Sequence, residues 1–220
     1  MQALLISLLL ALPVQDEARL SRIEVVMDAR TWEDVSASTW LPQGYGSGYL
    51  AGPGEVRLCD RLTCIVMLKP DSNAGRLPGT VRFGVKPVAG SSLADRLAAD
   101  SNHLELMEIT EPQVPDLAAP SDSLPLMYYL SEAEVSVPTE RIAGLEILFR
   151  SSGARVVREG QGLVIDFSSQ RLRIVPAWGE AGVSRLSFAL RRELPGNPTF
   201  RFGAMSRLRF GPNRTATWSF

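Results

Sequence analysis

The stretch from Leu20 to Pro70 constrains the fold more than any other part of the chain. Arg22–Met27 (RIEVVM) predicts a strand, and Asp28 or Thr31 after it can cap a helix. Two further predicted strands flank a short polar turn and predict a hairpin; they are Glu55–Cys59 and Cys64–Lys69. The order strand, helix, hairpin therefore predicts a compact module that mixes α and β structure.

The segment between the first helix and the hairpin predicts no phosphate-binding loop. Trp32 and Val35 lie three residues apart, so they share a helix face that can pack on a sheet. Pro42 and three glycines then loosen the chain in GYGSGY, which ends at Tyr49. This stretch lacks the GxxxxGK[ST] pattern of a phosphate loop. A glycine-rich strand with bulges is the better prediction.

The middle of the chain contains the strongest candidate for a domain boundary. Thr80–Val85 alternates like a strand, Ser92 can cap a short helix, and His103–Ile109 predicts another strand. The segment Glu111–Pro125 holds four prolines and predicts a long surface loop or domain connection. We therefore divide the chain into a first module at 20–110, the proline-rich loop at 111–125 and a second, strand-rich module at 126–220.

The second module reads as a series of short strands separated by polar turns. The predicted strands are Leu126–Leu130, Leu145–Phe149, Arg155–Arg158, Leu163–Phe167, Arg171–Val175, Val183–Leu190, Thr199–Phe202 and Arg207–Phe210. The short spacing favours tight antiparallel connections over helical crossovers. We predict an α+β fold dominated by curved, mainly antiparallel sheet, with few short helices.

The N-terminus has the pattern of an export signal. Ala3–Leu12 is uncharged and apolar, has about the length of a signal-peptide core, and is too short to span a bilayer. Pro13 ends the run. No basic residue precedes it and no clear cleavage site follows it, so a buried first helix stays as the alternative. We predict a signal peptide at 1–18 and an exported protein without stable membrane insertion after processing.

The two cysteines agree with export. Cys59 and Cys64 flank the predicted hairpin turn, where opposite residues come close enough for a disulfide. Such a bond is expected in an oxidising compartment. A redox-active pair or half of a metal site is the functional alternative. However, the chain has only these cysteines and one histidine, too few for a structural zinc site of Cys and His ligands.

Charge gives no indication of a nucleic-acid partner. The chain has 23 basic and 24 acidic residues, so no net field attracts a polyanion. Arginines alternate with apolar residues in the last predicted strands, at Arg201, Arg207 and Arg209. Bases stacked on aromatic residues would explain this pattern, but the two opposite faces of a half-buried strand explain it better.

The first module resembles the vicinal oxygen chelate superfamily, which includes glyoxalases, bleomycin-resistance proteins and extradiol dioxygenases. The likeness lies in RIEVVMDARTWEDV, in the glycine-rich strand and in the hairpin into TCIVML. The stretch Gly144–Arg191 looks like a second, divergent copy. The resemblance implies paired glyoxalase-like βαβββ modules and is strongest to secreted bacterial glyoxalase-like proteins of unknown function.

The metal-binding pattern of this superfamily is largely missing. The resemblance implies a His or Gln on the first strand of a module and a Glu on its last strand. Here the first position falls on Glu24 and the last on Val66, or on Met67 in the next register. In the second copy the analogous strand holds Ile174 and Val175. Aliphatic side chains and a thioether are poor ligands for hard or borderline metals, so we expect no metal and no other cofactor.

Catalysis has few candidate residues. Glu24 and His103 are the weak candidates for a relocated or metal-free site, and His103 is the sole imidazole. Glu105 would share a strand face with His103, but an exposed strand edge explains both. No GxSxG elbow is present. Whether the protein is an enzyme stays open, and these residues favour a protein that is not one.

These observations predict an exported glyoxalase-like protein that binds a small hydrophobic ligand. Trp40, Tyr49, Val66 and Met67 are expected to face its cleft, although packing in the core explains the same residues. One alternative is a divergent lyase, isomerase or dioxygenase of the superfamily. The other is an accessory interaction domain that uses the proline-rich loop or the C-terminal arginines.

Overall fold

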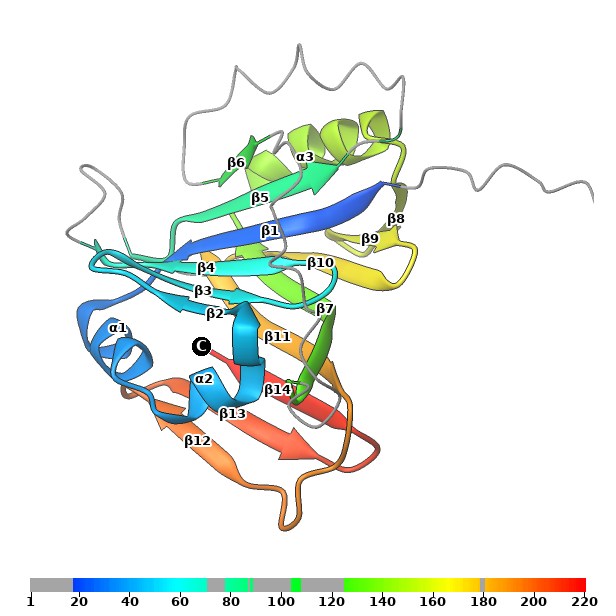
Figure 1. The fold of residues 1–220 in the computed structure, drawn as a ribbon. Coiled ribbons are helices and arrows are strands. Elements are labelled where there is room, and N and C mark those ends of the chain that lie inside the picture. Colours follow the sequence, from blue (N-terminus) through cyan, green and yellow to red (C-terminus); the bar gives the residue numbers. More distant parts are fainter. Residues whose placement is uncertain (1–17, 71–77, 87, 89–103, 108–124, 179–180) are drawn as a thin grey trace, which may run out of the picture.

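The computed structural model describes residues 18–70, 78–86, 88, 104–107, 125–178 and 181–220. In these residues the fold is mixed α+β, with one six-stranded and one eight-stranded sheet and few short helices (Figure 1). Both sheets are curved and most neighbouring strands are antiparallel. The predicted fold class is therefore confirmed.

The first sheet has the strand order β2-β3-β4-β1-β5-β6. Its strands are β1 (Arg19–Val26), β2 (Tyr49–Ala51), β3 (Glu55–Cys59), β4 (Cys64–Leu68), β5 (Val81–Lys86) and β6 (Leu104–Met107). β1 pairs in parallel with β4 and antiparallel with β5. The sequence placed most of these strands correctly except for their ends. The glycine-rich strand expected in GYGSGY is wrong, because Gly44 and Tyr45 end a helix, Gly46–Gly48 forms a 3-10 turn and the strand begins only at Tyr49.

The second sheet has the strand order β12-β13-β14-β11-β7-β10-β9-β8. Its strands are β7 (Met127–Val137), β8 (Arg155–Glu159), β9 (Gly162–Phe167), β10 (Gln170–Pro176), β11 (Gly182–Leu190), β12 (Thr199–Phe202), β13 (Ser206–Gly211) and β14 (Thr215–Ser219). The sequence pattern did not predict the last of these. In β12 and β13 the arginines expected on the solvent face are exposed: Arg201, Arg207 and Arg209.

The helices are α1 (Ala29–Ser36), α2 (Trp40–Tyr45), α3 (Thr139–Ser151) and a single 3-10 turn at Gly46–Gly48. Asp28 caps α1 as predicted, because its carboxylate accepts a hydrogen bond from the Thr31 amide at 2.9 Å. Trp32 and Val35 are buried on one face of α1. Helix α2 was not predicted, because its glycine and proline argue against a helix interior.

The two halves repeat the same arrangement of elements. β1-α1-β2-β3-β4 and β7-α3-β8-β9-β10 are both βαβββ units, and in each the first and last strands pair in parallel. β5 and β11 then pair antiparallel with the first strand of their own unit. A bulge interrupts the pairing of β1 with β5 at Ser21, and another interrupts the pairing of β7 with β11 at Ser131. These two bulges lie at equivalent positions of the first strands of the two units.

One predicted element is wrong. Leu145–Phe149, expected as a strand, belongs to α3. The buried side chains of α3 are Ile142, Leu145 and Phe149, and their spacing of three and four is that of one helix face. The second unit therefore begins at Met127 and not near Gly144.

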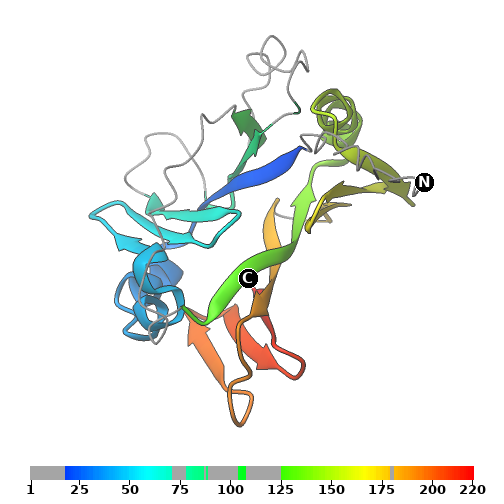
Figure 2. The same ribbon diagram turned by 45° about the vertical axis from the view of Figure 1, so that its right-hand side comes forward.

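The described elements share one hydrophobic core, which lies between the two sheets. Figure 2 shows α1 and α2 at one end of this space and α3 at the other. Phe149 on α3 meets Phe83 of the first sheet and Phe167 of the second, with ring centroids 6.3 and 6.0 Å apart. These edge-to-face contacts join both halves through one helix.

Several predictions concern segments outside the described residues. They are the signal peptide, the helix after Ser92, the imidazole of His103 and most of the loop Glu111–Pro125. Within the described residues, none of the helices has the length and apolar character needed to cross a membrane.

Candidate functional site

Glu24, the predicted first-strand position, is buried and ion-paired. It lies on β1 between Val66 of β4 and Arg82 of β5. Its carboxylate is 2.5 Å from Arg22 Nη2 and 3.7 Å from Arg82 Nη1, and the residue is 6% exposed. Two guanidinium groups therefore offset the buried negative charge.

The same position in the second half has the same chemistry. Glu134 lies on β7 opposite Arg173 of β10 and Arg185 of β11. Its carboxylate is 2.9 Å from Arg185 Nη2 and 4.0 Å from Arg173 Nε. Ile174, predicted for the last-strand position, is buried in the core, because the register places Arg173 there.

Neither carboxylate suits a divalent cation. Each has arginine neighbours, and the partner on the last strand of its unit is Val66 or Arg173. A cation would have to displace a guanidinium and would find no second anionic ligand on that strand. In the part of the chain that the structure describes, no three His, Cys, Asp or Glu side chains converge.

The four residues predicted for an apolar cleft do not share one. Met67 points into the main core, whereas Val66 packs with Val26 and Leu68 in a small cluster on the opposite face. This follows from strand alternation, which sends adjacent side chains to opposite faces. The rings of Trp40 and Phe200 contact each other at a tilt of 30°, with centroids 4.7 Å apart. Tyr49 is partly buried against the main core.

A pocket of about 290 Å³ lies where the two halves meet, and we call it the junction pocket. The end of β1, the end of β7 and the start of β11 converge there. Its lining is mostly apolar and consists of Val25, Val26, Met27, Asp28, Pro78, Gly79, Ser136, Ala181, Gly182, Val183, Ser184 and Phe220. None of the four predicted cleft residues is among them.

A second pocket, of about 550 Å³, is open and polar and lies on the outer face of the eight-stranded sheet. Arg155, Asp166, Arg171 and Glu132 cross four neighbouring strands of this face in register and alternate in sign. The Asp166 carboxylate lies 2.9 Å from Arg171 Nε and is partly exposed. This row of charges neutralises itself, so it offers little excess charge to a ligand.

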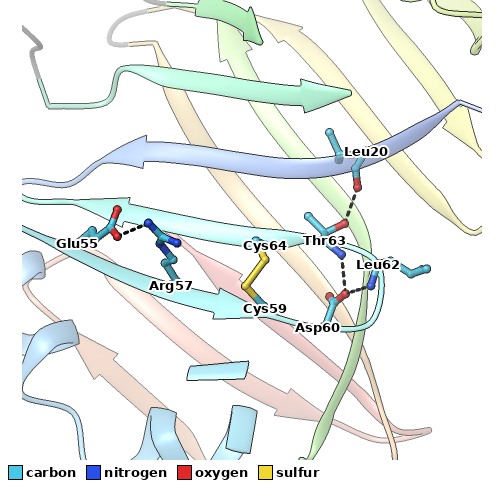
Figure 3. Close-up of a disulfide and its surroundings, with 8 residues drawn as sticks. All are labelled: Leu20, Glu55, Arg57, Cys59, Asp60, Leu62, Thr63 and Cys64. Atoms are coloured by element: carbon cyan, nitrogen blue, oxygen red, sulfur yellow. Dashed lines mark hydrogen bonds and ion pairs between the residues drawn. A yellow bond between two sulfur atoms is a disulfide. The ribbon is translucent and has the colours of Figure 1, made fainter. Parts of the chain in front are cut away.

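The predicted disulfide is present between Cys59 and Cys64, and the turn that it closes contacts the other sheet (Figure 3). Asp60 accepts hydrogen bonds from the amides of Leu62 and Thr63 at 2.7 and 2.8 Å. Its other oxygen accepts one from the Leu130 amide of β7 at 2.6 Å. Asp60 thus joins the hairpin to the second half of the chain.

Thr63 strengthens this connection. Its hydroxyl donates a hydrogen bond to the Leu20 carbonyl at 2.7 Å (Figure 3). The same hydroxyl accepts one from the side-chain amide of Gln170 at the start of β10. Gln170 also donates to the Leu130 carbonyl at 3.3 Å. Buried polar groups in this region are therefore largely paired, with the hydroxyl of Tyr45 as an exception.

The buried carboxyl of Asp60 should make the stability of the folded protein depend on pH. Burial raises the pKa of Asp60 from 3.8 to about 6, although three backbone amides and Arg61 act in the opposite direction. Because the folded-state pKa exceeds the unfolded one, the folded protein binds the extra proton. The contribution of Asp60 to the stability of the folded protein is complete below pH 3.8 and is lost as the pH rises through 6.

Urea unfolding of wild type and Asp60→Asn between pH 4 and 7 measures this contribution, because the other titrating groups are common to both proteins. Relative to the variant, wild type should gain up to about 3 kcal/mol as the pH falls. A stability difference that stays constant, or changes with the opposite sign, would contradict the raised pKa.

Comparisons with known proteins give distant structural similarity only. No family model matches the chain, and no curated protein sequence matches it. One similar solved structure is a xylose isomerase-like TIM barrel/4-hydroxyphenylpyruvate dioxygenase fusion protein, at 12% identity and a TM-score of 0.45. The match covers 82% of this chain and 38% of that one.

A second is a mutant of 4-hydroxymandelate synthase from Streptomyces coelicolor, at 14% identity and a TM-score of 0.41. It covers 81% of this chain and 72% of that one. At these TM-scores and identities the similarity assigns neither an activity nor a substrate to this chain.

Proposed function

We propose that this protein is an exported binding protein that holds a small, mainly apolar molecule in the junction pocket. The observation that carries this proposal is the pocket itself, which is lined mainly by apolar groups from both βαβββ halves. The sequence predicted an apolar ligand beside Trp40 and Tyr49, whereas we now propose the junction pocket as its binding site. Ligand sites commonly lie between two structural units.

The backbone at the wall of the pocket is closely packed. Gly79 has φ +85°, and a Cβ added to it would lie 2.6 Å from the Ala181 carbonyl oxygen. Gly182 approaches Gly79 in the same way, since its own Cβ would be 3.3 Å from the Gly79 carbonyl oxygen. Glycine at both positions lets the two halves meet at the pocket.

Asp28 gives the pocket one ionised group. Burial raises the pKa of Asp28, but hydrogen bonds from Thr31 and Arg30 outweigh this effect and bring it below the ordinary value. The carboxylate can accept a hydrogen bond from a ligand hydroxyl. The volume lies below the usual range for drug-sized ligands, so we infer a compact molecule with an apolar body and one donor group.

Binding of p-cresol and of toluene, which lacks the hydroxyl, tests this proposal by ligand-observed NMR. We expect p-cresol to bind and toluene to bind several-fold more weakly, because toluene cannot donate to Asp28. Ala181→Phe should fill the pocket and abolish binding, whereas Ala204→Phe, at an exposed position outside the pocket, should not. Failure of both probes to bind, or equal binding by Ala181→Phe and wild type, would overturn the proposal.

Two observations support export: the apolar run Ala3–Leu12 and the Cys59–Cys64 disulfide, which suits an oxidising compartment. Intact mass spectrometry of the protein expressed in a bacterial host tests this part. The protein should be recovered outside the cytoplasm without the segment that contains this run. Recovery of the full-length chain in the cytoplasm alone would contradict export.

A further inference from the structure

A tyrosine with two arginines lies where the disulfide hairpin meets the second sheet. Arg61 in the hairpin turn donates a hydrogen bond from Nη1 to the Tyr128 hydroxyl at 2.5 Å. The guanidinium carbon of Arg61 is 5.0 Å from the centre of the Tyr128 ring, and that of Arg191 is 4.6 Å from it. Three separate elements thus bring two cations to one aromatic ring.

These two arginines have no carboxylate partner among the described residues. Arg22, Arg173 and Arg185 all lie within 4.0 Å of an acid, but no ion pair in the described part of the chain involves Arg61 or Arg191. In addition, the buried Nε of Arg191 has no hydrogen-bond partner there. Leaving the buried Nε of Arg191 without a partner is costly unless a further group supplies the acceptor.

The nearest acid cannot supply that acceptor. Asp60 precedes Arg61 in the chain, but its two oxygens already accept three backbone amides, from Leu62, Thr63 and Leu130. It is only 4% exposed, so it faces the interior. The charge of Arg61 is thus open to an external anion, since Arg61 itself is exposed.

We propose that Arg61, Arg191 and Tyr128 form a binding site for an oxyanion, such as a carboxylate or phosphate group. Guanidinium groups match the oxygens of both anions. The Tyr128 hydroxyl accepts its hydrogen bond from Arg61, so its own proton remains available to an anion oxygen. All three side chains then donate, which is the arrangement that a multiply oxygenated anion requires.

The framework around this site is already fixed. The Cys59–Cys64 disulfide and the Asp60–Leu130 hydrogen bond hold the turn that carries Arg61 against the strand that carries Tyr128. A site whose parts are held in advance loses less entropy on binding. None of its three residues lines the junction pocket, so this inference does not depend on the proposed function.

Titration of the oxidised protein with inorganic phosphate or with acetate, at ionic strength held constant with sodium chloride, tests the site. Chemical shifts of the Tyr128 and arginine side chains report binding. We expect saturable shifts with at least one oxyanion and none with chloride. Stronger binding of phosphate would indicate a phosphorylated ligand, and stronger binding of acetate a carboxylate.

Four single variants separate this site from general surface charge. Arg61→Gln and Arg191→Gln should each weaken binding about tenfold, and Tyr128→Phe should do so less. Arg201→Gln removes an exposed arginine elsewhere on the second sheet and should leave binding unchanged. The proposal is overturned if neither oxyanion exceeds chloride, or if binding survives in the folded double variant of Arg61 and Arg191. In either case the cluster would serve only to pack the hairpin.

Discussion

Replacing Phe149 with alanine is expected to lower the free energy of unfolding by about 3–5 kcal/mol. The side chain is 1% exposed and packs edge-to-face on Phe83 and Phe167. Its removal leaves a cavity between the two sheets and also breaks two aromatic contacts. Because those contacts belong to different halves, neither half can close the cavity alone.

Chemical denaturation followed by circular dichroism measures this effect. Ile147→Ala is the matched control, because it truncates an apolar side chain of the same helix that is 57% exposed. The control should change stability by no more than about 0.5 kcal/mol. Equal effects of the two substitutions would show that α3 does not pack between the sheets as described.

Glu24→Gln is expected to cost about 3 kcal/mol, because it removes the negative partner of a buried ion pair. The glutamine keeps the shape of the side chain but leaves Arg22, whose side chain is 25% exposed, without this counter-charge. Guanidinium groups cannot lose their charge near neutral pH, so the desolvation cost remains uncompensated.

Glu134→Gln provides the comparison within the same molecule. Glu134 has the equivalent strand position and also pairs with arginines, but its side chain is 24% exposed and Arg185 is 41% exposed. Water compensates such a loss, so we expect no more than about 1 kcal/mol. Urea unfolding of both variants tests this difference; similar losses would mean that burial does not govern the strength of the two ion pairs.

Much of the first half could be predicted from the sequence because its signals are local. The cap at Asp28, the buried face of Trp32 and Val35, and the pairing of Cys59 with Cys64 each depend on residues a few positions apart. Short-range patterns of this kind reflect backbone geometry directly.

The second half was harder to predict because an apolar run does not specify its own secondary structure. Leu145–Phe149 suits a buried strand as well as a helix face, and only the spacing back to Ile142 favours the helix. That spacing is the signal that identifies the complete βαβββ unit from Met127 to Pro176.

The candidate sites depend on contacts that local patterns do not contain. Arg61 and Tyr128 are 67 positions apart, and the walls of the junction pocket come from both halves. The predicted pair Val66 and Met67 failed for a simpler reason, since neighbouring strand residues cannot face the same cleft. Strand alternation alone is therefore enough to exclude this pair from a shared site.

The repeated arrangement has a consequence for Thr63 and Gln170. Arg22 and Glu132 follow the bulge in their own halves, and they pair with Cys64 and Arg171. Thr63 and Gln170 directly precede these two partners, so they occupy equivalent positions in the two halves. They also hydrogen-bond to each other. A substitution at either residue therefore acts on both halves at once. Because one side chain is a glutamine and the other a threonine, the first half supplies the acceptor of this hydrogen bond and the second half supplies the donor.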